Sequence, residues 1–314
     1  MREALTGWMA IHVDPAFAGA AVVRIGTGHS RAMYRIAAGN GHRAVVRVEQ
    51  GGVFGTAGAE ECRVMASLHR ARYPVARIIG DEPSGTVIGR PFFVMEFLEG
   101  DASAEERAID RRTAGEFVEA LARLHRLDGA DFGFDLLPAS SGDATPLQVN
   151  RWLDVFRSAV DDADPLIEEA AAWLTLHAPP LARLSVVHGD AGPGNFVHHD
   201  GAVVAVTDWE FAHLGDPAED FAFCLTMRGS RTMGRDEWLW LFAERAGFHM
   251  GEEQWRYWEA FNLFKGACAN RTCLRLFEDG VNRSPNMAII GTTLHQVFLR
   301  RLADLIGARG KPIR

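Results

Sequence analysis

The sequence predicts an α+β protein of two lobes, the first built on a small antiparallel sheet and the second mainly helical. Up to residue 98, short apolar runs rich in Val, Ile and Phe alternate with turn residues, as strands do. After residue 100, apolar side chains recur every three or four positions over long segments, as on amphipathic helices. We therefore expect an N-terminal lobe over 1–98 and a C-terminal lobe over 99–314.

The elements of the N-terminal lobe follow from these runs. One helical pattern, over 57–73, interrupts the strands and ends at Tyr73-Pro74, since a residue that precedes proline disfavours the helical conformation. The predicted strands cover 20–25, 32–38, 44–50, 75–80, 86–89 and 91–98.

In the C-terminal lobe, helices are expected on both sides of a short β region. The polar segment 138–146, "PASSGDATP", reads as a loop, and strand character returns at 184–190 and 202–210. The predicted helices cover 111–129, 147–160, 165–178, 235–247, 252–277 and 292–307.

Composition excludes several classes of protein. The N-terminus has no signal-peptide pattern and no apolar stretch reaches 18 residues, so we expect a cytoplasmic protein without a membrane partner. The net charge of −8 argues against a nucleic-acid-binding protein, whose affinity would depend on a basic face. The four cysteines show no CxxC pair and are expected to be buried thiols. Either a monomer or a homodimer fits the sequence.

The stretch "VHGDAGPGNF", residues 187–196, lies between two apolar runs and places Asp190 and Asn195 in one loop. Thirteen residues later, Asp208 ends the next apolar strand in "TDWEF". Magnesium prefers oxygen ligands, which Asn195 and Asp208 offer, and Asp190 then remains free to accept a proton from a hydroxyl. Asp and Asn are also common turn residues, but the joint spacing of all three at strand–loop junctions favours chemistry.

This pattern, HGDxxxxN followed by DWE and "GDPAED", resembles the aminoglycoside phosphotransferase family, relatives of the protein kinases and choline kinases. The resemblance implies a bilobal protein-kinase-like fold and an ATP- and magnesium-dependent enzyme that phosphorylates a hydroxyl of a small molecule. It makes Asp190 the catalytic base and Asn195 and Asp208 the metal ligands. It also implies that His188, Asp216 and Asp220 brace the loop.

The same resemblance gives the N-terminal lobe a nucleotide-binding role. The turn "RIGTGHSRAMYRI" would close over the phosphates through Gly28 and the amides of His29 and Ser30. Arg47 stands where protein kinases carry a phosphate-binding lysine, as in the branch related to phosphotransferase domains fused to acyl-CoA dehydrogenases. Glu61 is its expected helix partner, with Glu60 as the adjacent alternative.

The segment "PFFVMEFLEG" resembles the kinase hinge, where backbone groups of an extended segment bind adenine. By this resemblance Met95 guards the back of the pocket, and the Glu96 carbonyl and Leu98 amide contact the adenine edge.

The sequence does not decide which molecule accepts the phosphate. Tryptophans and the acidic excess after residue 100 favour a cationic acceptor, such as a polyamine antibiotic or an amino alcohol, although core packing explains most of the aromatics. Lys265, Asn270 and Arg271 favour an anionic or acyl-CoA-like one, and sugars and hydroxyacyl compounds are further candidates. A nucleotide-binding pseudokinase, acting as a sensor or scaffold, is the alternative function that the Arg47 substitution suggests.

Overall fold

The computed structural model describes residues 1–25, 31–102, 109–181, 183–229 and 232–307. The N-terminal sheet has the strand order β1-β2-β3-β5-β4, and every neighbouring pair is antiparallel. Its strands are β1 (Ala21–Ile25), β2 (Arg31–Ala37), β3 (Arg43–Glu49), β4 (Ile78–Glu82) and β5 (Phe92–Glu96).

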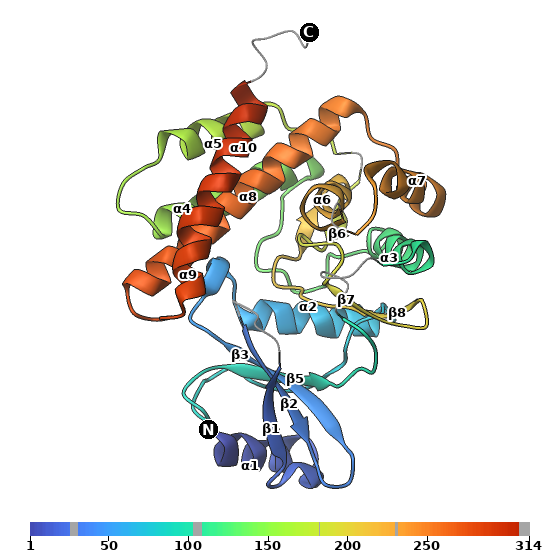
Figure 1. Cartoon of the computed structure of the whole chain (residues 1–314), viewed down its shortest axis with the longest axis vertical. Coiled ribbons are helices and arrows are strands. Elements are labelled where there is room, and N and C mark those ends of the chain that lie inside the picture. Colours follow the sequence, from blue (N-terminus) through green and yellow to red (C-terminus); the bar gives the residue numbers. More distant parts are fainter. Residues whose placement is uncertain (26–30, 103–108, 182, 230–231, 308–314) are drawn as a thin grey trace.

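Two helices cover the opposite faces of this sheet. Helix α1 (Arg2–His12) buries Leu5 and Met9, four residues apart, against the outer face, a helix that the sequence analysis did not predict. Helix α2 (Gly58–Arg70) lies between the sheet and the helical lobe (Figure 1). Because side chains alternate along β3, Val46 faces the α1 side and Val45 packs with the α2 side.

The second lobe is mainly helical, with four short strands around its loops. Its strands are β6 (Ser185–Val187), β7 (Phe196–His199), β8 (Ala202–Val206) and β9 (His213–Gly215). Its helices are α3 (Arg111–Leu124), α4 (Ala144–Ser158), α5 (Pro165–Leu176), α6 (Ala218–Phe223), α7 (Arg235–Ala246), α8 (Glu252–Glu278), α9 (Pro285–Ile289) and α10 (His295–Gly307). The π-helical segments η4 (Cys224–Arg228) and η6 (Ile290–Leu294) continue α6 and α9.

Two predicted segments differ from the structure. Residues 86–89 form turns instead of a strand, because they lie between Gly85 and Gly89, whose φ angles are +72° and +79°. The polar loop predicted over 138–146 is shorter, since the 3₁₀ turn η3 (Ser141–Asp143) and the start of α4 occupy its second half. Pro146 fits in the first turn of α4, where its missing N–H is not needed.

The core runs through both lobes. One cluster joins Val45 and Met95 of the sheet to α2, α3 and α7, so the lobes share packed side chains near the β6–β9 region. A second cluster joins α4, α5, α8 and α10 (Figure 1). In the described part of the chain, every helix is too short or too polar to cross a lipid bilayer.

Candidate active site

The loop after β6 turns sharply at Gly189 and presents Asp190. Gly189 has φ +79°, and a Cβ there would lie 2.5 Å from the Phe211 carbonyl oxygen, so only glycine fits. Asp220 at the start of α6 fixes this turn, because its carboxylate accepts the backbone N–H groups of His188 and Gly189 at 2.9 and 2.8 Å.

Two buried side chains complete the support of the loop. Burial would raise the pKa of Asp220, but hydrogen bonding to His125 at 2.9 Å and the backbone donors outweigh it and hold that pKa below its usual value. His188 is fully buried, and its Nδ1 accepts the Asp190 amide while Nε2 donates to the Thr207 carbonyl oxygen at 2.9 Å. The positions of His188 and Asp220 match the bracing roles that the sequence suggested.

A buried lysine also holds the loop from α8. Lys265 donates from Nζ to the Gly189 carbonyl oxygen and to Glu219, both at 2.6 Å, and Glu219 also meets His213 at 3.1 Å. The sequence analysis considered Lys265 as a contact for an anionic acceptor. Only about 1% of the Lys265 surface is exposed, so in the structure this residue supports the loop instead.

The Asp190 carboxylate is engaged by two neighbours. Asn195 donates from Nδ2 to the Asp190 backbone carbonyl at 2.8 Å and to its Oδ2 at 2.7 Å. Arg228, from the end of η4, donates from Nε to Oδ1 at 3.0 Å and from Nη2 to Oδ2 at 2.6 Å. The sequence analysis missed Arg228, since no periodic pattern marks a residue that a π-helix presents.

The β7–β8 hairpin brings Asn195 beside Asp208. Thr207 donates its amide to the Asn195 carbonyl at 2.9 Å, and Asp208 follows directly with φ +67°. A left-handed non-glycine residue of this kind is uncommon and often lies at a functional site. Because Asn195 directs its amide nitrogen to Asp190, its Oδ1 is left as the oxygen ligand, so Asn195 and Asp208 fit a magnesium ion that phosphate oxygens and water would complete.

Arg47 on β3 joins the two lobes at this point. Its Nη1 lies 2.7 Å from Glu61 of α2, and its Nη2 donates to Asp208 at 2.8 Å. Burial would lower the pKa of Arg47, but the two carboxylates raise it above its ordinary value. Burial would likewise raise the pKa of Asp208, but Arg47 outweighs it and lowers that pKa. Of the two adjacent candidates, Glu61 pairs with Arg47, and Glu60 lies 3.8 Å from Arg151 instead.

A second arginine extends this network. Arg31 on β2 lies 3.8 Å from Glu61 and 3.9 Å from Glu210, and Thr56 donates to Glu210 at 3.3 Å. Burial and the charge of Asp208 raise the pKa of Glu210 to about 8. Arg31 and Glu210 were not predicted. Arg31 is one of many arginines in the predicted strands, and in the DWE motif the resemblance assigns a role only to Asp208, not to Glu210.

The predicted hinge residues lie in β5 and directly after it, where the chain passes from the sheet to the C-terminal lobe. Met95 is buried opposite Val45, and Leu98 follows β5 by two residues and packs on the core. The Glu96 side chain accepts the Arg77 amide at 2.9 Å on the outer side of the sheet. The phosphate-binding turn predicted at Gly28, His29 and Ser30 lies outside the described residues.

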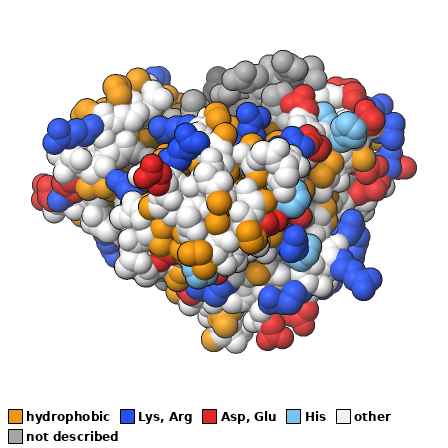
Figure 2. Space-filling view, turned by 90° about the horizontal axis from the view of Figure 1, so that it is seen from below, with side chains coloured by type: hydrophobic (Ala, Val, Ile, Leu, Met, Phe, Trp, Pro, Cys, Tyr) orange, Lys and Arg blue, Asp and Glu red, His pale blue; other side chains and the backbone are white. Residues whose placement is uncertain are grey.

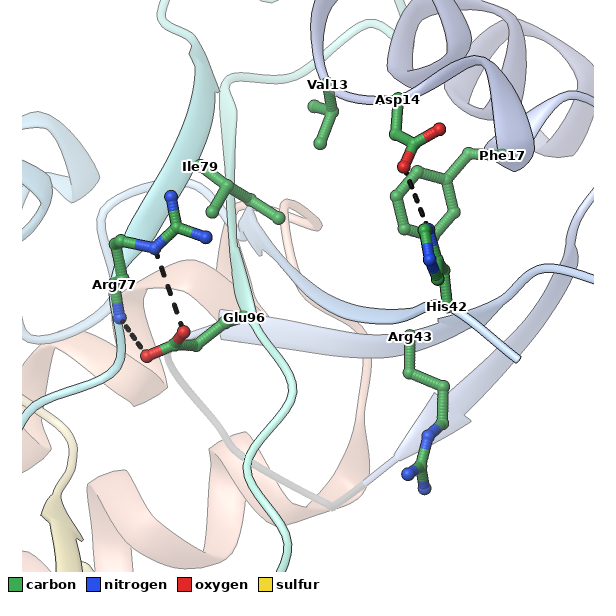
Figure 3. A pocket seen from close by; sticks show the side chains of 8 residues that line it. All are labelled: Val13, Asp14, Phe17, His42, Arg43, Arg77, Ile79 and Glu96. Carbon is green, nitrogen blue, oxygen red and sulfur yellow. Dashed lines mark hydrogen bonds and ion pairs between the residues drawn. The ribbon is translucent and has the colours of Figure 1, made fainter. Parts of the chain in front are cut away.

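A separate pocket of about 360 Å³ lies between the α1 end and the edge of the sheet (Figure 3). Four of its polar side chains form two pairs: His42 meets Asp14 at 2.8 Å, and Arg77 lies 3.8 Å from Glu96. Glu96, a predicted adenine contact, lines this pocket, but none of the residues predicted for phosphate, metal or proton transfer does, so the Asp190 loop is the candidate reaction centre.

Comparison with known proteins shows which sequences and structures the chain is similar to. The family model described as "Phosphotransferase enzyme family" matches residues 21–260. Acyl-CoA dehydrogenase family member 10 of Mus musculus is 34% identical over 174 residues, which cover 52% of this chain and 16% of that protein. The chain thus matches only about a sixth of that relative's length.

Solved structures share the fold. A putative aminoglycoside phosphotransferase from Ralstonia eutropha has a TM-score of 0.67 and 24% identity, with 97% of this chain and 98% of that one covered. A spectinomycin phosphotransferase in complex with ADP and spectinomycin has a TM-score of 0.60 and 12% identity, with 97% of each chain covered. The predicted α+β, kinase-like fold is confirmed.

Proposed function

The chain belongs to the phosphotransferase enzyme family, and from this premise we propose that it transfers the γ-phosphate of ATP to a hydroxyl of a small molecule. The observation that carries the proposal is the convergence of Asp190, Asn195 and Asp208 at the junction of the lobes, with Arg47 reaching the same point from β3. The ADP complex of the spectinomycin phosphotransferase, a protein of the same fold, supports the choice of nucleotide.

The reaction follows from these positions. Asp190 orients the acceptor hydroxyl and takes its proton while the hydroxyl oxygen attacks the γ-phosphorus in line. The new bond joins that oxygen to phosphorus, and the bond to the β–γ bridging oxygen breaks, so ADP leaves with the electron pair. Asn195 and Asp208 would hold magnesium, which neutralises charge on the phosphates when bound.

The positive charge of Arg47 explains both how its side chain is held in place and how it assists the reaction. Its guanidinium is held between Glu61 and Asp208, so it is fixed in position before a nucleotide binds. A fixed cation beside the proposed metal ligand stabilises the negative charge that develops on the transferred phosphoryl group. This pairing weakens the pseudokinase alternative, because the arginine keeps the helix contact that a phosphate anchor requires.

Replacement of Asp190 by Asn tests the proposal. We expect turnover to fall by at least about 1,000-fold, since an amide cannot accept the proton, while binding of MgATP changes little. The measurement is ATP consumption with pools of aminoglycosides, macrolides, choline-like amines, sugars and hydroxyacyl compounds, beside calorimetric nucleotide binding.

A matched control is Asp200→Asn, in the exposed turn of the β7–β8 hairpin, where φ is +48° and Asn is tolerated. This variant should keep wild-type activity. Full activity of the Asp190→Asn protein would remove Asp190 from the base role. Nucleotide binding without turnover in any acceptor pool would favour the pseudokinase function.

A further inference from the structure

Arg228 and an acceptor hydroxyl both need the Asp190 carboxylate, and that carboxylate has room for both. Arg228 donates from Nε to Oδ1 of Asp190 at 3.0 Å and from Nη2 to Oδ2 at 2.6 Å. Asn195 also donates to Oδ2, at 2.7 Å. A carboxylate oxygen accepts about two hydrogen bonds, so these contacts of the described residues fill Oδ2 and leave one place on Oδ1. A hydroxyl can therefore bind Asp190 at Oδ1 while Arg228 stays where it is.

The same contacts bring Arg228 close to the phosphoryl group that the proposed reaction transfers. A hydroxyl on Oδ1 of Asp190 shares that oxygen with Nε of Arg228, so the phosphorus that it attacks comes beside the guanidinium. Arg228 and Asn195, a proposed metal ligand, also meet on Oδ2. Burial would raise the pKa of Asp208, but Arg47 and then Arg228 lower it, so the charge of Arg228 also acts on the second proposed ligand. Arg228 thus lies between the base and the proposed metal site.

A positive charge is useful at this point, because the base and the phosphoryl group are both negative. Asp190 is a carboxylate, and a transferred phosphoryl group spreads its charge over its equatorial oxygens. Arg47 brings positive charge from the opposite lobe, where it pairs with α2. Lys265 contacts the same loop, but it is paired with Glu219 and only about 1% exposed. Arg228 is placed to offset the repulsion between the base and the phosphoryl group.

The loop is shaped to hold this arginine. Gly192 has φ +149°, and a Cβ there would lie 2.7 Å from the Arg228 Cβ, so the missing side chain makes room for the arginine stem. Nη1 donates to the Pro193 carbonyl oxygen at 3.4 Å. Arg228 ends the π-helical segment η4, and π-helical turns are frequent at functional sites. A guanidinium that is fixed before the reaction stabilises developing charge without having to reorganise.

We propose that Arg228 is a catalytic residue that stays on Asp190 and donates hydrogen bonds to the transferred phosphoryl group. A planar guanidinium carries several N–H groups, so one side chain can serve the carboxylate and the phosphoryl oxygens together. The acceptor proton goes to Asp190, the hydroxyl oxygen bonds to phosphorus, and ADP leaves with the electron pair of the broken bond. Arg228 keeps its protons throughout. This inference rests on the proposed phosphotransferase function and adds a residue to its mechanism.

The test compares a mimic of the transition state with a mimic of the ground state. Aluminium fluoride with MgADP imitates the planar phosphoryl group, with water in the place of the hydroxyl, and MgAMP-PNP imitates bound MgATP. Calorimetry on the whole chain measures how far aluminium fluoride raises the affinity for MgADP. We expect an increase of about 1,000-fold in the wild type and of about tenfold or less in Arg228→Met, while the Kd of MgAMP-PNP changes less than about threefold.

Turnover provides a second measurement. ATP consumption with the acceptor pools should fall about 100- to 1,000-fold in Arg228→Met, at an unchanged KM for ATP, because the contact is made in the transition state. Arg228→Lys should keep part of both effects, since it retains the charge and loses the planar fork. Arg245→Met is the matched control, because Arg245 is exposed on the neighbouring helix α7 and pairs with Glu119. It should match the wild type, and thermal unfolding of each variant checks the fold.

A double variant separates contact with the phosphoryl group from support of the base. If Arg228 acted only by holding Asp190, Arg228→Met would have no effect in the Asp190→Asn protein. We expect it to lower the aluminium fluoride effect by about a further tenfold in that background.

Three results would overturn the inference. One is a wild-type aluminium fluoride effect in Arg228→Met, or no such effect in a wild type that turns over ATP. Another is a loss in Arg228→Met that vanishes in the Asp190→Asn background, which would make Arg228 a positioning residue. The third is equal weakening of both mimics, which would make it a contact of the ground state only. Failure of the phosphotransferase function itself is distinct, since the wild type would then show no ATP turnover with any acceptor.

Discussion

At the scale of single residues, Arg47 carries a prediction that distinguishes arginine from lysine. Its two terminal nitrogens meet Glu61 and Asp208 at the same time, which the single nitrogen of lysine cannot reproduce. We expect Arg47→Lys to raise the KM for ATP about tenfold and to lower the free energy of unfolding by about 1–3 kcal/mol, because one buried carboxylate loses its partner. Steady-state kinetics and urea unfolding measure the two effects.

Arg35→Lys is the control, since Arg35 is exposed on the neighbouring strand β2. Both parameters should stay at wild-type values in this variant. Unchanged kinetics in Arg47→Lys would show that the bridging geometry of Arg47 has no part in nucleotide use.

The residues that could be predicted from sequence are those fixed by motif or strand alternation. Asp190, Asn195 and Asp208 stand at strand ends, and the structure brings them to one place. Glu61 was expected to pair with Arg47, and it does, but the spacing alone did not exclude Glu60, because both lie in the first turn of α2 and the rotation of the helix decides which faces β3. Arg228 could not be found at all, since its position depends on the extra residue that the π-helical turn contains.

At the scale of elements, Gly266 sets the contact between α8 and α10. A Cβ at this position would overlap the ring of Phe298. We expect Gly266→Ala to lower the free energy of unfolding by about 1–3 kcal/mol, because overpacking outweighs the better helix propensity of alanine. Chemical denaturation followed by far-UV circular dichroism measures the change.

The control substitution is Gly7→Ala in α1, where a Cβ would meet no atom within 4 Å. Here only helix propensity acts, so the variant should be more stable by about 0.5–1 kcal/mol. Equal effects at the two glycines would mean that α8 and α10 separate without cost.

Long periodic segments were predictable, and irregular ones were not. The helix predicted over 252–277 corresponds to α8, whose middle part is buried over most residues from Tyr257 to Cys273. The segment predicted as one helix over 292–307 begins instead as η6, because Gly291 packs directly against Leu274 of α8 and the backbone widens there. Contacts with another element decide such local changes, so the sequence of the segment alone does not contain them.

At the scale of the whole molecule, a chain of charges links the lobes. Glu210, Arg31, Glu61, Arg47 and Asp208 follow one another, with the first and last in the C-terminal lobe. Phe54 adds a second link, since its amide donates to Thr272 on α8 at 3.0 Å. The face seen in Figure 2 carries charges of both signs in small groups, whereas the chain of charges between the lobes is largely buried.

Because Asp208, the proposed metal ligand, lies in this chain of charges, we expect binding at the site to stabilise the whole molecule. A ligand at 100 times its Kd adds about 2.7 kcal/mol to the free energy of unfolding. We expect AMP-PNP with magnesium to raise the midpoint of thermal unfolding more than AMP-PNP with a chelator does. In Asp208→Asn this magnesium-dependent increment should disappear, since an amide is a weaker ligand for a hard cation.

The increment is the quantity to compare, because Asp208→Asn also removes a partner of Arg47 and changes the stability of the ligand-free protein. Asp208 and Asp200 both have positive φ, at +67° and +48°, and Asn is accepted in this region, so Asp200→Asn controls for the backbone as well as for the chemistry. It should show the wild-type increment. The same increment in both variants would take Asp208 out of the metal site and leave it only the role of holding Arg47 between the lobes.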